Sequence, residues 1–257
     1  MKAAITGWCV HLPGLAAGQT LAGWDPGAGC SPEDAPQLLG RKGLLAKEPA
    51  TRLALCAVHR ALGLPAKAPR RGDGPPDPST AVVISSNLGN AATVAKVARA
   101  VRDEGVHAVS PLDAPNVSSN VIASTVAIWF GFGGPNLMVC SGEPSGLDAV
   151  TLGALLISCG RARRAVVVGV EPADPVATAL YGAPLLEGSA CVLLEKDGGV
   201  LVETGQSGPG LALAGHGFGA QGVLEVAVAA AVVSQRGGYA AVSCEGRTVR
   251  VCSEGRR

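Results

Sequence analysis

Hydrophobic positions along the chain alternate between two patterns. Short continuous apolar runs are typical of strands covered on both faces. They occur at 2–6, 80–85, 137–140, 165–170 and 187–195. Apolar residues spaced three or four positions apart, as on one face of a helix, separate these runs. The helices predicted in this way cover 48–62, 90–103, 117–130, 144–160 and 223–235. This alternation predicts an α/β layered fold.

The remaining segments give weaker signals. Residues 13–42 and 65–78 are rich in Gly or Pro and are predicted to be irregular. Residues 200–204 predict a strand that pairs as a hairpin with the strand before it, and 239–252 predicts one or two final strands. The helix at 117–130 is apolar nearly all round, which indicates that it is buried.

Composition excludes several classes of function. The formal net charge is only +1 and aromatic residues make up 3% of the chain. A basic surface and stacking side chains are therefore missing, and we predict neither a nucleic acid nor a membrane partner. No apolar run approaches the roughly 20 residues of a membrane span, and no signal peptide is recognised at the start. These features favour a cytoplasmic protein.

The eight cysteines predict reduced thiols, most of them buried. None forms a CxxC pair, and most lie inside apolar runs. A secreted disulfide framework would be shorter and denser in cysteine. We predict no metal and no cofactor.

The most informative stretch is 133–150, GGPNLMVCSGEPSGLDAV. An apolar strand leads into a small-residue turn, Ser141-Gly142, and a helix is predicted to start at Glu143-Pro144 with the proline in its first position. Such a corner holds one side chain, here Glu143, at the positive end of a helix. Strand–turn–helix corners of this kind often carry the nucleophile of an enzyme.

The opening AAITGWCVHLPG is similar to the first strand and loop of the β-ketoacyl synthases of the thiolase-like superfamily, and EPATRLALCAVHRALGL to their first long helix. Further segments resemble this family in the same order. Residues 109–150 resemble the central segment that ends in the active-site elbow. RARRAVVVGVEP, LLEGSACVLLEK and GHGFGAQGVLEVAVAAAVV are similar to later strands and to the late Gly-His motif.

The resemblance implies a thiolase-like α/β layered fold in one ketosynthase-like domain over 1–257. Residues 1–205 would form a nearly complete N-terminal half, and 206–257 a strongly trimmed remnant of the C-terminal half. The family's glycine-rich loop before the final strand would be reduced to 244–246. In this family the strand before the elbow pairs across a dimer, and an apolar edge should not stay exposed. The resemblance therefore implies a homodimer, or a heterodimer with a full ketosynthase.

The departures from the family pattern concern its chemistry. Counted back from Leu147, the family's nucleophilic cysteine falls on Glu143, while Cys140 lies earlier on the strand and is expected to be a buried small hydrophobe. The family's second histidine aligns with His216, its lysine falls on Leu211, and its first histidine has no counterpart. Claisen condensation needs a thiolate to hold the acyl chain, which a carboxylate cannot replace.

Two interpretations follow for Glu143, and two for His216. Glu143 is either a capping acid left by a decayed site, or an active group that serves as a base or faces an acyl-carrier substrate. His216 is either structural or its acid–base partner.

Residues 217–222, GFGAQG, also match the dinucleotide-binding pattern G-x-G-x-x-G, with Glu245 near the place of a ribose-binding acid. Too little chain follows for a βαβ-based sheet, so this interpretation is not favoured.

The sequence thus predicts a ketosynthase-like protein of a bacterial polyketide or fatty-acid-type pathway that does not condense by the usual route. It would act as the partner subunit of a ketosynthase, or bind acyl carrier protein or an acyl thioester. One alternative is an enzyme that uses Glu143 and His216 as acid and base on a β-keto or polyene intermediate. A structural remnant is the third interpretation.

Overall fold

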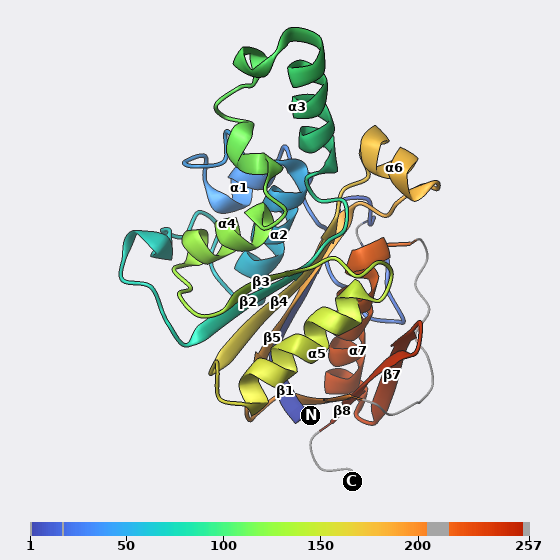
Figure 1. The fold of residues 1–257 in the computed structure, drawn as a ribbon. Helices are drawn as coiled ribbons and strands as arrows, with labels where there is room; N and C mark the ends of the chain where they lie inside the picture. Colours follow the sequence, from blue (N-terminus) through green and yellow to red (C-terminus); the bar gives the residue numbers. More distant parts are fainter. Residues whose placement is uncertain (1, 17, 205–215, 254–257) are drawn as a thin grey trace.

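The computed structural model describes residues 2–16, 18–204 and 216–253, and Figure 1 shows their path. The described strands are β1 (Lys2–His11), β2 (Thr80–Ser85), β3 (Asn136–Val139), β4 (Arg164–Glu171), β5 (Gly188–Glu195), β6 (Val200–Thr204), β7 (Tyr239–Cys244) and β8 (Arg247–Cys252). The described α-helices are α1 (Ala35–Leu39), α2 (Pro49–Ala61), α3 (Ala91–Glu104), α4 (Val121–Phe130), α5 (Ser145–Ser158), α6 (Pro175–Tyr181) and α7 (Gln221–Arg236). Short 3₁₀ turns are η1 (Arg71–Asp73), η2 (Val106–Ala108), η3 (Ala114–Val117) and η4 (Phe218–Ala220).

The strands form one sheet in the order β3-β2-β4-β5-β1-β6-β8-β7. β2 runs parallel to both β3 and β4, with Val83 opposite Leu137 on one side and Val167 on the other. From β4 onward, every neighbouring pair is antiparallel. The parallel part of the sheet therefore ends at β3, which is an edge strand.

Helices cover both faces of the sheet (Figure 1). Val83 and Val167 point into a core shared with α5 and α7, while their neighbours Val82 and Val166 point into a core shared with α2 and α4. This alternation is the period of two that a strand imposes. The arrangement confirms the predicted α/β layers and explains why β2 and β4 are apolar at 81–84 and 165–168, where both faces are covered.

The predicted hairpin of 187–195 with 200–204 is wrong. β1 lies between β5 and β6, and it pairs with both. The connection crosses β1 closely: a Cβ on Gly199 would lie 2.1 Å from the carbonyl oxygen of Ile5. Gly199 also has a φ of +66°, so the crossing depends on glycine.

The helices differ from expectation mainly at their ends. Pro144 is the N-cap of α5 and not its first residue, because the helix begins at Ser145. The buried helix expected from residue 117 begins at Val121, since extended backbone at Ser118 separates it from η3. α1 and α6 are additional. In α6 the side chain of Asp174 caps the backbone N–H groups of Val176 and Ala177.

The segment Phe218–Arg236 consists of η4 and α7. It corrects the expectation that no apolar run approaches the length of a membrane span. It has 19 residues and a mean hydropathy of 1.4, enough to cross a membrane by length and composition. However, 67% of it is buried against the rest of the protein. Its apolar character is therefore that of a core helix.

The eight cysteines are free thiols. The prediction that most of them are buried holds for four. Cys9, Cys56, Cys191 and Cys252 are buried, and Cys30 and Cys244 are partly exposed. Cys140 and Cys159 are exposed, which contradicts the expectation of a buried Cys140.

Candidate functional site

The turn between β3 and α5 forms the predicted elbow. Gly142 has a φ of +83°, which glycine adopts without strain. The buried hydroxyl of Ser145 donates to the carbonyl of Gly142 at 2.7 Å and accepts from the backbone N–H of Ser141 at 2.7 Å. The first residue of the helix thus closes the turn that precedes it.

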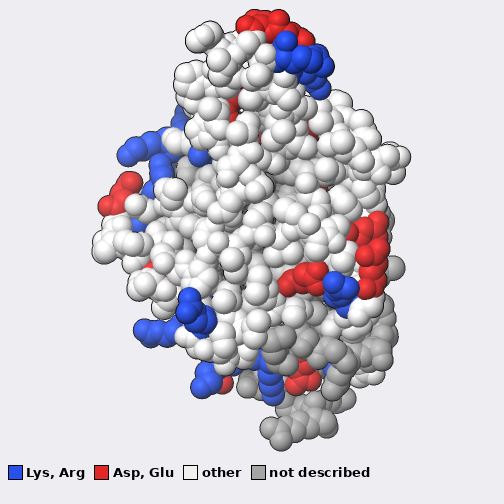
Figure 2. Space-filling view, viewed as in Figure 1, with Lys and Arg blue, Asp and Glu red and all other residues white. Residues whose placement is uncertain are grey.

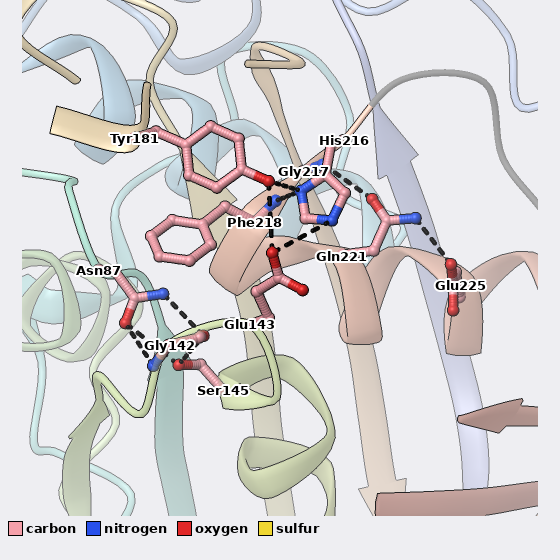
Figure 3. A network of polar contacts seen from close by, with 10 residues as sticks. All are labelled: Asn87, Gly142, Glu143, Ser145, Tyr181, His216, Gly217, Phe218, Gln221 and Glu225. Carbon is pink, nitrogen blue, oxygen red and sulfur yellow. Dashed lines mark hydrogen bonds and ion pairs between the residues drawn. The ribbon is translucent and has the colours of Figure 1, made fainter. Parts of the chain in front are cut away.

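Asn87, which follows β2, holds the elbow from the neighbouring strand. Its side-chain amide donates to the carbonyl of Gly142 at 2.9 Å, and its Oδ1 accepts from the N–H of the same residue at 3.1 Å. Figure 3 shows this pair of bonds. The backbone immediately before Glu143 is therefore fixed in two directions.

Glu143, Tyr181 and His216 come together above the elbow (Figure 3). His216 Nε2 lies 3.8 Å from Glu143 Oε1, and the Tyr181 hydroxyl lies 2.7 Å from His216 Nδ1 and 3.4 Å from Glu143 Oε1. The side chains of Glu143 and His216 are 40% and 42% exposed, so solvent reaches both. The structure thus brings together the two residues singled out from the sequence and adds Tyr181.

The hydrogen bonds define where protons lie in this cluster. The backbone N–H of Phe218 donates to His216 Nδ1 at 3.1 Å, so neutral His216 carries its hydrogen on Nε2, facing Glu143. The Tyr181 hydroxyl can donate either to Nδ1 or to Glu143. Burial, and then the negative charge of Glu143 and its hydrogen bond, raise the pKa of Tyr181. The three groups form a short path along which a proton can be held or passed.

The start of α7 positions His216. The N–H of Gly217 donates to Gln221 Oε1 at 2.8 Å, and the Gln221 amide donates to Glu225 at 2.7 Å. The carbonyl of His216 accepts from the N–H of Leu186 at 3.0 Å. Burial raises the pKa of Glu225.

Glu171, at the end of β4, is a buried carboxylate that the sequence analysis missed. It accepts from the N–H of Asn87 at 2.6 Å, the N–H of Leu88 at 3.0 Å and the Ser86 hydroxyl at 3.1 Å. Burial raises its pKa to about 7, although these bonds and one from the N–H of Gly219 oppose the shift. Glu171 therefore ties the loop that carries Asn87 to η4.

The missed residues left different signals in the sequence. Glu171 is a single acid directly after the apolar run 165–170, and this contrast could have pointed to it. Asn87 follows the carboxyl end of a buried strand, and binding sites are common at the carboxyl ends of strands in α/β sheets. Tyr181 belongs to α6, which was not predicted, and no motif surrounds it.

The other positions compared with the family pattern lie as follows. Cys140 directly follows β3, and its Sγ donates to the carbonyl of Ser86 at 3.0 Å. Leu211 lies outside the described residues.

Residues 244–246 form the tight turn between β7 and β8, with positive φ at Glu245 and Gly246. Burial, and then the charge of Glu143, raise the pKa of Cys244. Arg247, which directly follows this turn, donates to Asp148 of α5 at 3.0 Å, so the turn lies beside the start of α5.

The glycines of the G-x-G-x-x-G match have packing roles. A Cβ on Gly219 would lie 2.3 Å from Asn87 Nδ2, and one on Gly222 would lie 2.6 Å from the N of Leu147. The strands after α7 form an antiparallel hairpin. These contacts account for the motif without a dinucleotide.

A hollow of about 650 Å³ lies away from the elbow, beside the first residues of β2 and β4 and the last residue of β5. Its lining residues include Asp77, Thr80, Arg163, Arg164 and Glu195. Arg164 and Glu195 are paired at 2.6 Å, so part of its charge is already neutralised. It contains neither Glu143 nor His216.

A family model described as "Beta-ketoacyl synthase, N-terminal domain" matches residues 37–184 of the 257. The chain belongs to the β-ketoacyl synthase family. The match includes the elbow, Glu143 and Tyr181, while His216 lies beyond it.

Two curated relatives are 3-oxoacyl-(acyl-carrier-protein) synthase 2 from Vibrio cholerae serotype O1 and from Vibrio harveyi. They are 31% and 30% identical over 103 residues, which is 40% of this chain. The matched stretch spans only 25% of each relative.

Three solved structures have the same fold. The ishigamide ketosynthase/chain length factor matches with a TM-score of 0.69 and 20% identity, over 98% of both chains. The ketosynthase ApeO in complex with its chain length factor ApeC from Xenorhabdus doucetiae matches with 0.65 and 15%, over 98% of this chain and 100% of that chain. A type II polyketide synthase acyl-carrier protein in complex with its ketosynthase, AntDE:AntF, matches with 0.69 and 11%, over 98% and 99%. The thiolase-like fold expected from the resemblance is thus confirmed.

Proposed function

We propose that this β-ketoacyl synthase family member is a non-condensing partner subunit of a ketosynthase in a bacterial polyketide or fatty-acid-type pathway. The proposal rests on the elbow between β3 and α5, at which Glu143 takes the place that the resemblance assigns to the family's nucleophilic cysteine. A carboxylate there cannot hold an acyl chain as a transferable thioester.

Cys140 offers no replacement for the missing thiol. It lies on the strand side of the turn, and its Sγ donates to the carbonyl of Ser86. Gly142 lies between Cys140 and Glu143 in the chain, and its backbone is held by two hydrogen bonds with Asn87. Moving the sulfur of Cys140 to the position of Glu143 would require breaking these two hydrogen bonds.

The surface around β3 supports a protein partner. β3 is an edge strand, and such edges normally pair or are covered. Ile128 of α4 and Leu155 of α5 are 64% and 43% exposed. Figure 2 shows that the broad middle of this face carries few charged side chains, which lie mainly around its rim. These features suit an interface with a ketosynthase or with a second copy of the chain.

The relatives supply the partner classes. Among the matched structures are a ketosynthase with its chain length factor and a ketosynthase with an acyl-carrier protein. The matches extend over nearly the whole of those chains. We include acyl carrier protein, or the acyl thioester it bears, as a second partner, and a cytoplasmic location.

One observation favours a second candidate function. Glu143, Tyr181 and His216 converge within 3.8 Å of one another at a solvent-accessible position. This arrangement supports an acid–base enzyme acting on a β-keto or polyene acyl intermediate. A structural remnant would require none of these contacts.

Co-expression with the candidate ketosynthase tests the first proposal. We expect a stable complex by size exclusion and light scattering, and a monomer that never associates with ketosynthase or itself would overturn it. Glu143→Gln and His216→Ala separate the two functions. A partner subunit keeps both association and pathway output, whereas an acid–base enzyme keeps association and loses output. An acyl-thioester adduct on Cys140 would show that the elbow is wrongly assigned.

A further inference from the structure

A second group of reactive side chains lies away from the elbow. His11 ends β1, Cys30 lies in the segment before α1, and Cys56 lies on α2. The two sulfur atoms are 4.0 Å apart, and His11 Nε2 lies 3.7 Å from Cys30 Sγ. Ligand-type atoms of all three residues fall within 4.8 Å of one another.

The segment that carries Cys30 is held in register along α2. Arg60 donates to the carbonyl of Ala28 at 2.8 Å, and Arg52 donates to the carbonyl of Pro32 at 3.3 Å. Arg52, Cys56 and Arg60 are four residues apart and therefore lie on one face of the helix. The segment runs antiparallel to this face, so its middle residue, Cys30, is held opposite Cys56 by a bond on either side.

The two thiols differ in exposure and in charge. Cys30 is partly exposed, whereas Cys56 is fully buried. Hydrogen bonds from Cys56 and His11, helped by the charge of Arg60, lower the pKa of Cys30. The hydrogen bond with Cys30 and burial raise the pKa of Cys56. An accessible thiolate beside a buried thiol is the arrangement found in redox-sensitive cysteine pairs.

We propose that Cys30 and Cys56 form a reversible dithiol–disulfide pair that responds to hydroperoxides. The Cys30 thiolate attacks the peroxide O–O bond and becomes a sulfenic acid, and the peroxide leaves as hydroxide or alkoxide. The Cys56 sulfur then attacks Cys30 Sγ, forming the S–S bond and releasing water. Cys30 and Cys56 together lose two electrons, and the hydroperoxide takes them up. The sulfur atoms must close from 4.0 Å to about 2.05 Å, a small movement for a surface segment.

The histidine favours this pair over a metal site made from the same residues. His11 Nε2 lies 3.0 Å from the carbonyl of Cys30, which places the ring hydrogen on Nε2. Its Nδ1 is buried and has no hydrogen-bond partner among the described residues. A metal on Nε2 would move the hydrogen to Nδ1, where metal-bound histidines normally need an acceptor.

Peroxide treatment of the reduced, purified protein tests the proposal. Under denaturing, non-reducing conditions we expect a mass loss of about 2 Da, the change for one disulfide, and a peptide that joins Cys30 to Cys56. Dithiothreitol should reverse both. In Cys56→Ser, dimedone should trap the sulfenic acid on Cys30, and in Cys30→Ser, Cys56 should stay a thiol.

Two further variants provide controls. Cys159 is exposed at the end of α5, and Cys159→Ser should form the disulfide at the native rate. Arg60→Gln should slow it by a factor of about three to ten, since a nearby cation favours the reacting thiolate. The peptide map of the native protein decides the matter even if a cysteine variant fails to fold.

Two results would overturn the proposal. One is oxidation of Cys140 or Cys159 while Cys30 and Cys56 remain thiols. The other is one equivalent of Zn²⁺ in the purified protein, lost on peroxide treatment and replaceable by Co²⁺ with a thiolate charge-transfer band. That result would make the cluster a metal site.

Discussion

Gly146 of α5 and Gly222 of α7 meet backbone to backbone. A Cβ on Gly146 would lie 2.7 Å from the N of Gly222, and a Cβ on Gly222 would lie 2.6 Å from the N of Leu147. The first turns of the two helices therefore cross at a distance that only glycine allows. Glu143 and His216 each lie a few residues before this crossing, so the contact is what brings them together.

Gly222→Ala should lower the free energy of unfolding by about 1–3 kcal/mol, because the added methyl group meets rigid backbone atoms of α5. Chemical denaturation followed by circular dichroism measures the effect. Gly14→Ala is the matched control, since a Cβ there meets nothing within 4 Å. Equal stability of the two variants would mean that the helices separate at little cost.

Asn87→Ala should loosen the elbow by leaving the N–H of Gly142 without its partner. We expect a loss of about 1–3 kcal/mol in unfolding free energy and faster hydrogen exchange at Gly142. Asn90→Ala also removes two amide bonds, to the carbonyls of Asn116 and Ser118, and should leave exchange at Gly142 unchanged. If hydrogen exchange at Gly142 stays slow in Asn87→Ala, the two bonds from Asn87 do not hold the elbow.

Glu171 should make stability depend on pH. Its folded pKa of about 7 lies above the ordinary value of 4.5, so between these values the folded protein binds a proton that the unfolded chain has lost. The unfolding free energy should therefore fall as pH rises from 4.5 to 7, with a slope approaching about 1.4 kcal/mol per pH unit from this group.

Glu171→Gln isolates this contribution, since other acids with raised pKa values, such as Glu225, stay in both proteins. Unfolding free energies of native and variant protein at several pH values give the difference in slope. Parallel curves would show that Glu171 keeps its charge in the folded state.

Tyr181 reports directly on Glu143. The chain has two tyrosines, so Tyr239→Phe leaves Tyr181 as the single tyrosine that titrates. Adding Glu143→Gln should lower the pKa of Tyr181, because it removes a neighbouring negative charge and its hydrogen bond. The ultraviolet absorbance of tyrosinate follows the titration. Glu33→Gln, which changes an acid elsewhere, should leave it unmoved.

Met138→Pro should prevent association through β3. The carbonyls of Pro135 and Val139 accept bonds from β2, so the N–H of Met138 points toward the free edge. Proline removes that donor without breaking a bond to β2. Met138→Ala loses the same side chain but keeps the N–H, and should still associate. Size exclusion with the ketosynthase compares them, and loss of the complex in both would point to side-chain packing instead.

The pattern of apolar residues along the sequence was enough to predict the strands at the centre of the sheet. Thr80–Ser85 was predicted to the residue, because a strand buried on both faces carries a continuous apolar run, here 81–84. The neighbours of β6 could not be predicted, since the apolar pattern of β6 fits β5 as well as β1. The close crossing of Gly199 over Ile5 decides between them, and it is a contact between distant residues.

The site was predictable where the chain itself forms the geometry. The small-residue turn and Pro144 placed Glu143 at the start of α5, and the late Gly-His motif pointed to His216. Tyr181 was missed because its position depends on α6 folding back over the elbow. The exposure of Cys140 was also missed, since an apolar run looks the same on an edge strand as on a central one.

The place of β1 between β5 and β6 has a consequence for how the chain folds. β1 is synthesised well before β6, so one of its edges finds its partner only when residues 200–204 have been added to the chain. During that interval the edge is free to pair with other extended chains. Late closure by β6 is a long-range contact that slows folding, so nascent chains should depend most on chaperones before β6 emerges.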